Sequence, residues 1–192
     1  AIGDYQEHTP RMRRLLKKYD WREAYMEEFL LEQALEASRA DHRFKRKIIE
    51  ELTKGLWPSE IPEILKRARV GARRVRTLER YVETHVQRID GNIAYVPNVP
   101  FGATGPAAEY AVRVLRANVG IATCRDGGYV RLSMRRGRRS SLNLNRIIGK
   151  LASQLGGSGG GHDAAVGGRI PVDRFDDFLK RLRQEVSGRG FQ

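Results

Sequence analysis

The character of the sequence changes near residue 86, and this change limits the folds that the chain can adopt. Residues 21–40 are rich in Glu, Ala, Leu and Met and contain neither glycine nor proline, which predicts a long helix. Three more helices are expected, over residues 42–54, 62–68 and 71–85. Beyond residue 86, short apolar stretches alternate with turns rich in glycine and proline. We therefore expect a helical connector over residues 1–85 and a domain of different architecture over residues 86–192.

The second half of the sequence reads as strands and helices in alternation. Strands are expected over residues 86–96 (with a turn at 90–92), 119–124, 129–134 and 164–170. Helices are expected over residues 107–117, 142–155 and 174–186, the first of them capped by Asn118. Asp126-Gly127-Gly128 is a strong hairpin signal. The order β-α-β-β-α-β-α predicts a small mixed sheet flanked by helices, so the chain is assigned to the α+β class.

The charge of the chain points to a polyanionic partner. The 36 Lys and Arg residues exceed the 23 Asp and Glu residues, which gives a net charge of +13 and a pI near 10.4. Such an excess attracts DNA, RNA, anionic lipid or an acidic protein. The ion-pair-rich surface of a heat-stable protein would explain the number of charges but not their imbalance. Because the arginines are also clustered, nucleic acid is the favoured partner.

Other features of the sequence indicate a cytoplasmic protein without a membrane partner. No apolar run approaches the roughly 20 residues that cross a bilayer, and no secretory signal opens the chain. The single cysteine, Cys124, excludes an internal disulfide and a multi-cysteine zinc site, and it is expected to be a small buried strand residue. The chain begins at Ala1 without a methionine, and we expect it to be a piece of a longer protein.

The glycine-rich segment 156–161, followed by His162-Asp163, is the most informative phrase for function. It is expected to be a loop that binds a ligand. Consecutive backbone N–H groups of a glycine loop can surround an anion, and the histidine can add a hydrogen-bond donor. A flexible linker is the alternative, but the segment lies between a helix and an apolar strand. A Walker loop is excluded because Gly-Lys-Ser/Thr is missing, and a dinucleotide fingerprint because a helix precedes the segment. The candidate ligand-binding residues are Ser158, Gly159, Gly160, Gly161 and His162.

A second candidate is the arginine-rich run 133–141, which follows a predicted strand. Arginine can hold phosphate in a bidentate manner, and Ser141 can cap the next helix. A solvated basic loop is the alternative. The run falls opposite the glycine segment across the helix 142–155, so both could border one cleft. The candidate nucleic-acid-binding residues here are Ser133, Arg135, Arg136, Arg138 and Arg139.

Further residues carry weaker signals. At helical spacing, one face would carry Arg69, Arg73, Arg76 and Arg80. This face could follow a nucleic-acid backbone or pack on an acidic partner, and the sequence leaves both open. Phe101, in a loop rich in glycine and proline, is the best candidate for stacking on a base. Asp41-His42 is interpreted as a capped turn rather than a metal site, and His8 and His85 lack a ligand set.

Several of these residues resemble a known family. Gly159-Gly-Gly-His162, Ala164-Ala165, Gly167-Gly168 and Ile170-Pro171 look like the glycine–histidine signature of the DHH-associated domain. Ser133-x-Arg135 resembles the Ser-x-Arg that ends a strand in that domain, and the order of elements matches over about residues 86–186. The resemblance implies the C-terminal region of a RecJ-like protein of the DHH phosphoesterase superfamily, with the glycines, His162 and Arg135 holding substrate.

The opening residues resemble a motif of the catalytic DHH domain. Ala1-Ile-Gly-Asp-Tyr-Gln-Glu7 is similar to the last motif of that domain in archaeal RecJ-like proteins, which places a metal ligand at Glu7, with Asp4 competing. The Asp-His-His motif and the earlier metal-binding aspartates are absent, so this chain cannot assemble a two-metal site, and no catalytic residue is assigned. The resemblance implies Mn or Mg for an active parent protein, and no cofactor is expected on this fragment itself.

Three functions follow from the resemblance. The first is the single-stranded DNA (or RNA) binding part of a RecJ-like exonuclease of DNA repair, which holds the phosphate backbone or the terminal nucleotide. The second is a catalytically inactive RecJ-like factor of DNA replication that docks GINS and the MCM helicase. The third is a small phosphodiesterase domain. The strong positive charge favours a long polyanion over a dinucleotide.

Overall fold

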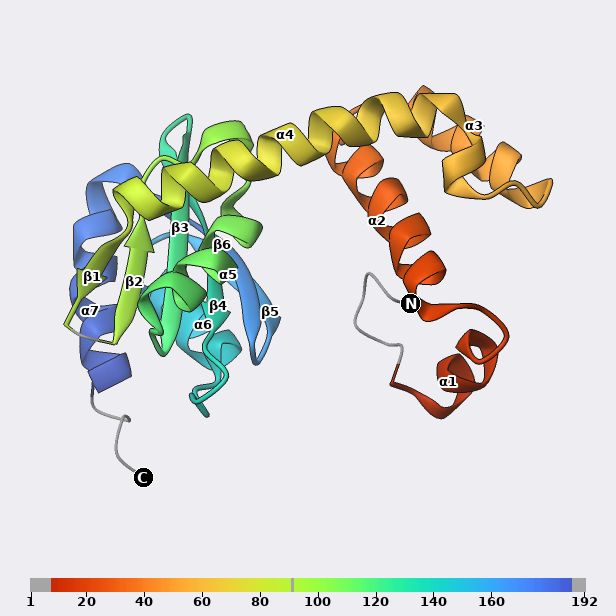
Figure 1. The fold of residues 1–192 in the computed structure, drawn as a ribbon. Coiled ribbons are helices and arrows are strands. Elements are labelled where there is room, and N and C mark those ends of the chain that lie inside the picture. The colour runs from red at the N-terminus through yellow and green to blue at the C-terminus, as the bar shows by residue number, and fades with distance from the viewer. Residues whose placement is uncertain (1–7, 91, 188–192) are drawn as a thin grey trace. The chain divides into compact units, whose positions relative to one another are not determined.

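The computed structural model describes residues 8–90 and 92–187 of the chain (Figure 1). The chain divides into two units, residues 1–76 and 77–192, and each has its own hydrophobic core. The division falls within helix α4 (Pro62–His85), because Leu78 and Val82 pack into the core of the second unit. No helix among the described residues is long and apolar enough to cross a membrane.

The first unit is helical. Its elements are α1 (Pro10–Leu16), α2 (Trp21–Ala37), α3 (His42–Thr53), η1 (Pro58–Glu60) and the beginning of α4. Asp41 accepts a hydrogen bond from the backbone N–H of Phe44 at 2.9 Å and caps α3, which confirms that Asp41-His42 is a capped turn. Apolar side chains of α2, α3 and α4 form the core of this unit.

The predicted helix break near Gly71 is wrong, because α4 runs without interruption from Pro62 to His85. A Cβ on Gly71 would lie 2.3 Å from the carbonyl oxygen of Gln33 in α2. The glycine therefore permits the backbones of α2 and α4 to approach closely, and it does not end the helix.

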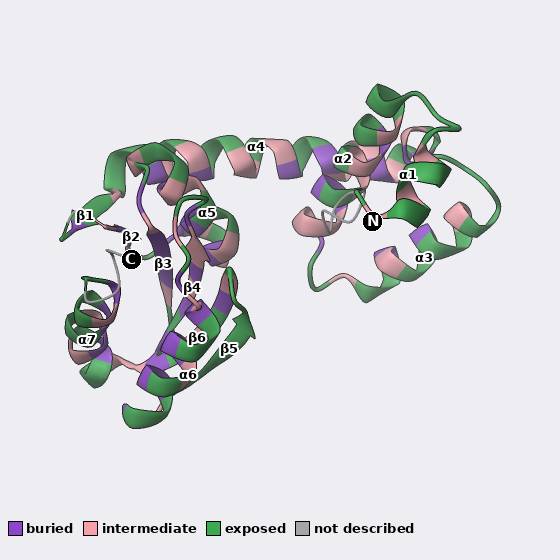
Figure 2. Ribbon diagram, turned by 90° about the horizontal axis from the view of Figure 1, so that it is seen from below, coloured by how far each residue is buried: buried purple, intermediate pink, exposed green. Residues whose placement is uncertain are grey.

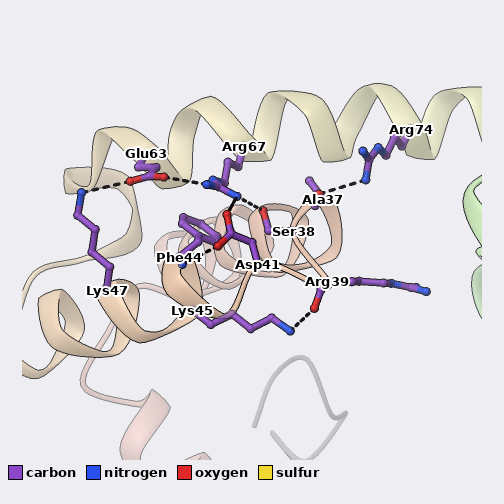
Figure 3. A network of polar contacts seen from close by, with 10 residues as sticks. All are labelled: Ala37, Ser38, Arg39, Asp41, Phe44, Lys45, Lys47, Glu63, Arg67 and Arg74. Carbon is purple, nitrogen blue, oxygen red and sulfur yellow. Dashed lines mark hydrogen bonds and ion pairs between the residues drawn. The ribbon is translucent and has the colours of Figure 1, made fainter.

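Arg67 of α4 is the centre of a polar network that joins α3 to α4 (Figure 3). Its guanidinium donates to Glu63 at 2.9 Å and to the Ser38 hydroxyl at 2.9 Å, and it lies 2.8 Å from a carboxylate oxygen of Asp41. The guanidinium also lies 3.8 Å from the centre of the Phe44 ring. The pKa of Asp41 is lowered by the Phe44 N–H and then by Arg67, and the pKa of Glu63 is lowered by Arg67 and then by Lys47.

This network makes the stability of the helical unit depend on pH. A lowered carboxyl pKa stabilises the folded state above the ordinary values of 3.8 and 4.5, and this contribution is lost as the pH falls below them. We expect the hydrogen-exchange protection factors of α3 and the first turns of α4 to fall as the pH drops from about 5 to about 3. Arg67→Gln should reduce this pH dependence, and an unchanged dependence in that variant would contradict the prediction.

The second unit is built on a six-stranded sheet. Its strands are β1 (Gln87–Ile89), β2 (Ile93–Val96), β3 (Val119–Asp126), β4 (Tyr129–Arg136), β5 (Ser158–His162) and β6 (Ala165–Pro171). The other elements are η2 (Pro100–Gly102), α5 (Thr104–Leu115), α6 (Leu144–Gln154), η3 (Val172–Arg174) and α7 (Phe175–Ser187). The strand order is β1-β2-β3-β4-β6-β5, and only the β2–β3 pair is parallel. The α+β class and the mixed sheet are confirmed.

Helices cover the two faces of this sheet unequally. One face packs against α6 and α7 through a core that includes Leu132, Ile148 and Phe178. On the other face, α5 and the end of α4 cover part of the sheet with small side chains such as Ala108 and Ala122. The burial pattern shows the result, because β3 is mostly buried while every residue of β5 is exposed (Figure 2). Strands β4, β6 and β5 therefore offer an open surface on the α5 side.

The expected glycine loop is the edge strand β5, which pairs antiparallel with β6. Glycine is disfavoured in strands, but here close packing requires it. A Cβ on Gly159 would lie 2.5 Å from Cγ1 of Ile148 in α6, and one on Gly161 would lie 2.5 Å from the carbonyl oxygen of Ala165. Two expected caps are also wrong: Asn143, not Ser141, caps α6 by accepting from the Arg146 N–H, and the residue that caps the end of α5 is Arg116 rather than Asn118.

Candidate nucleic-acid interface

The register of three strands places the candidate residues on one face of the sheet. Residues directly opposite one another in an antiparallel pair project to the same face. Three rows cross the surface in this way: Arg131–Arg169–Ser158, Ser133–Gly167–Gly160 and Arg135–Ala165–His162. The intervening residues, such as Leu132, Gly168 and Gly159, face α6. The glycine–histidine segment and the Ser-x-Arg motif therefore share an open face, with β6 between them.

Arginine side chains border this face. The Arg131 guanidinium donates to the carbonyl oxygen of Gly102 at 3.1 Å and to the Cys124 sulfur at 3.3 Å. Cys124 is half-buried rather than fully buried. Arg169 donates to the Ser158 hydroxyl at 3.3 Å, and its guanidinium lies 5.2 Å from the Tyr129 ring centre. These contacts orient the guanidinium groups beside the face.

The first turn of α5 supports the middle of the face. The hydroxyl of Thr104, which is buried at the start of α5, lies 2.9 Å from the hydroxyl of Ser133. The Arg135 guanidinium lies so close to α5 that a Cβ on Gly105 would be 2.9 Å from its Nη2. Arg135 also donates to the carbonyl oxygen of Met134 at 3.1 Å. Ser133 and Arg135 are thus held from the α5 side, while Gly167, Gly160 and His162 in their rows stay exposed and Ala165 is half-buried.

The glycines of this region divide into two classes. Packing against α6 or within the hairpin requires Gly159, Gly161 and Gly168, because a Cβ at each would lie 3.0 Å or closer to another atom. Gly160 and Gly167 point to the open face, and a Cβ there would meet nothing closer than 3.7 Å and 3.8 Å, respectively. The packing of the protein therefore does not require glycine at these two positions. Gly160 and Gly167 together form a surface without side chains, which we call the glycine floor. Such a surface lets a ligand approach the backbone closely.

A groove of about 560 Å³ lies over Gly167. Arg131, Ser133, Ser158, Gly167 and Arg169 are among its lining residues, and its acidic lining residue is Asp126. With Arg135 and His162 in the next row, the surroundings of the groove are positively charged. Sequence reasoning missed Arg131 and Arg169. The alternation in β6 could have found Arg169, because it places this residue on the same face as Gly167.

Three of the other predicted residues, Arg136, Arg138 and Arg139, do not lie on this face. Arg136 projects to the α6 side and donates to the carbonyl oxygen of Leu142 at 3.0 Å. Arg138 and Arg139 line a different cavity, at the end of α5. Phe101 is exposed in η2 with a φ of 58°, and Arg69, Arg73, Arg76 and Arg80 are exposed on α4. The helix 142–155, expected to separate the two motifs, packs instead on the opposite face.

The described residues offer no metal centre. Within residues 8–90 and 92–187, no three His, Cys, Asp or Glu side chains could hold an ion. Asp4 and Glu7, the candidate ligands of the resemblance, lie outside the described residues.

The second unit is an α+β domain whose sheet has an open face bordered by arginines. The model of the DHHA1 domain matches residues 90–188, just over half of the chain. The chain belongs to this family of DHH-associated domains. No curated protein matches the chain.

Several solved structures are similar to parts of this chain at low sequence identity. The pGpG-specific phosphodiesterase PggH from Vibrio cholerae is 17% identical with a TM-score of 0.51, over 67% of this chain and 44% of that one. An exopolyphosphatase-related protein from Bacteroides fragilis is 17% identical with a TM-score of 0.50, over 78% of this chain and 44% of that one. RecJ from Thermus thermophilus, in complex with Mg²⁺, is 19% identical with a TM-score of 0.47, over 68% of this chain and 21% of that one. The chain thus spans less than half the length of each of these proteins.

Proposed function

We propose that the groove over β4, β6 and β5 holds the phosphate backbone or terminal nucleotide of single-stranded nucleic acid, as the substrate-holding part of a RecJ-like exonuclease. One observation carries this proposal: Gly160 and Gly167 form a floor that packing does not require, between Arg131 and Arg169 on one side and Arg135 and His162 on the other. Backbone approach and guanidinium groups together are what a phosphate needs.

The charge and the family support a nucleic-acid ligand. The net charge of +13 attracts a long polyanion, and single-stranded DNA is the proposed partner, with RNA as the close alternative. Membership of the DHH-associated domains supports a phosphoester ligand. Catalysis, with Mn or Mg, is proposed only for a parent protein that supplies the metal ligands, because the described residues hold no such group.

Binding of labelled single-stranded DNA to Arg135→Ala and His162→Ala tests the proposal. Loss of a charged hydrogen bond to phosphate costs about 1.5–3 kcal/mol, so we expect Arg135→Ala to lower the affinity about tenfold or more. The slope of log affinity against log salt concentration should become shallower by about one unit in this variant. His162→Ala should also weaken binding, because it removes a hydrogen-bonding group from the row that contains Arg135. Fluorescence anisotropy at several salt concentrations measures both quantities.

Arg174→Ala is the matched control, because it removes one exposed charge from η3, outside the lining of the groove. It should leave the affinity nearly unchanged. If both Arg135→Ala and His162→Ala bind as the unaltered chain does, the groove is not the binding site. The replication factor that docks GINS and the MCM helicase would then become the leading proposal, and pull-down with GINS would be its test.

A small phosphodiesterase domain is the second candidate, and the fold of PggH favours it. That protein is named for pGpG, a linear dinucleotide. The groove of about 560 Å³ would suit a ligand of that size. This candidate predicts that a dinucleotide competes fully with longer oligomers, with no gain in affinity as the oligomer lengthens.

A further inference from the structure

A second basic cavity lies at the end of α5. It has a volume of about 390 Å³ and is lined by four arginines, Arg113, Arg116, Arg138 and Arg139. The first two belong to the end of α5, and the other two follow β4 directly. No acidic residue lines this cavity. The four charges are therefore close together without a carboxylate among the lining residues.

The walls of this cavity are held rigidly. The Gly137 N–H donates to the carbonyl oxygen of Asn118 at 2.8 Å, and a Cβ on Gly137 would lie 2.2 Å from the carbonyl oxygen of Ala117. The segment after β4 thus rests directly on the segment after α5. Arg138 and Arg139 directly follow Gly137. The backbone contacts of Gly137 therefore set where the Cα atoms of these two arginines lie relative to the end of α5.

Arg116 occupies a position that glycine usually fills. Its φ of 49° and ψ of 38° place it in the left-handed conformation at the end of α5. This conformation is unfavourable for a residue with a long side chain. The turn alone does not explain why an arginine stands here in place of glycine. A contribution of its side chain to an anion site would explain it.

Compensation of the helix dipole does not account for the cluster. Cations near a helix end balance its partial negative charge and its free carbonyl groups. Here Arg88 already donates to the carbonyl oxygen of Leu115 at 2.6 Å, and the Ala117 N–H donates to that of Val112 at 3.2 Å. Among the described residues, none of the four lining arginines makes an ion pair or side-chain hydrogen bond, although Arg113 lies over the Tyr110 ring at 5.4 Å.

We propose that this four-arginine cavity is a second phosphate subsite, which holds a phosphate of the same single strand beyond the groove. The inference rests on the proposed function of the groove. Arg135 and Arg138 are three residues apart, so their Cα atoms lie at most about 11 Å from each other. One strand can therefore contact both sites. The substrate class that uses both is an oligonucleotide longer than a dinucleotide, which separates this domain from one that binds pGpG-sized ligands.

The experiment compares a dinucleotide with progressively longer single-stranded DNA, using fluorescence anisotropy. The variant is the double substitution Arg113→Gln/Arg116→Gln, and its matched control is Arg174→Gln/Lys180→Gln, which removes the same charge from η3 and α7. We expect the cavity variant to bind the long oligomer at least tenfold more weakly, with a salt slope shallower by one to two units. Its affinity for the dinucleotide should change by less than about twofold. Unlabelled inorganic polyphosphate, added as a competitor, shows whether the cavity prefers nucleic acid or any chain of phosphates.

The outcomes separate this inference from the proposed function of the groove. If Arg113→Gln/Arg116→Gln binds the long oligomer with unchanged affinity and salt slope, the subsite is refuted, even if Arg135→Ala shows that the groove binds. If the cavity variant weakens binding of the long oligomer and the groove variants do not, the cavity binds phosphate and the proposal for the groove fails. Equal loss in the cavity variant and its control would show only an effect of net charge, and it would overturn the subsite.

Discussion

Gly167→Val is expected to lower the affinity for single-stranded DNA at least tenfold, about 1.4 kcal/mol, without lowering the free energy of unfolding. Gly167 lies at the centre of the groove floor, between Ser133 and Gly160. A Cβ here would meet no atom closer than the Leu132 carbonyl oxygen at 3.8 Å, and valine is favoured in strands. The branched side chain would occupy the space above the floor, where the phosphate is proposed to lie.

Gly168→Val is the matched control, because the neighbouring residue projects to the opposite face. A Cβ on Gly168 would lie 3.0 Å from the Ser158 carbonyl oxygen and 3.3 Å from Cδ1 of Ile148. Overpacking of this kind costs about 1–3 kcal/mol, so this variant should lose stability. Urea denaturation and anisotropy measure the two effects separately. If Gly167→Val binds DNA as tightly as the unaltered chain, the floor has no role in binding.

Gly120→Ala is expected to produce the largest loss of stability in the sheet unit, about 1–3 kcal/mol or more. Gly120 lies in β3 beneath α5, and a Cβ there would be 2.1 Å from the carbonyl oxygen of Ala108. The obstructing atom belongs to a helix backbone, so the whole of α5 must shift. Because the first turn of α5 contains Thr104, which contacts Ser133, the affinity for DNA should also fall.

The measurement must report on the sheet unit. Both tryptophans, Trp21 and Trp57, lie in the helical unit, so tryptophan fluorescence would miss the change. Hydrogen exchange of peptides from β3 and α5 reports it directly. Gly149→Ala in α6 is the control: a Cβ there meets nothing within 4 Å, and removal of a helical glycine should stabilise by about 0.5–1 kcal/mol. If Gly120→Ala and Gly149→Ala behave alike, the close approach of α5 to β3 is not important for stability.

Features that depend on residues close together in sequence could be predicted from the sequence alone. The α+β class, the hairpin at Asp126-Gly127-Gly128 and the capped turn at Asp41 all follow from local periodicity or from one side chain near its own backbone. The surplus of positive charge is also a property of composition alone. The two motifs of the candidate site, Ser133-x-Arg135 and the glycine–histidine segment, were likewise visible before any pairing was known.

Only the tertiary structure shows which structural role each glycine has. A glycine in sequence predicts a turn, a loop or a helix boundary: Gly159 is expected in a loop, and Gly71 at the start of a separate helix over residues 71–85. In the folded chain, Gly71 lies in the middle of α4 against α2, and Gly159 lies in an edge strand against α6. Local propensity favours neither arrangement. Contacts between segments distant in sequence override it, because only glycine allows such close approach.

By itself, the sequence determined the α+β class of the chain, its positive charge and the two motifs that hold arginine, glycine and histidine. The tertiary structure alone decided which of these residues share a surface. The register of β4, β6 and β5 brings Arg135 into one row with His162 and adds Arg169 to the site, while Arg138 and Arg139 turn to a separate cavity. The physical reason is that strand pairing alternates side chains between two faces, so a residue's surface depends on a partner strand that local sequence does not specify.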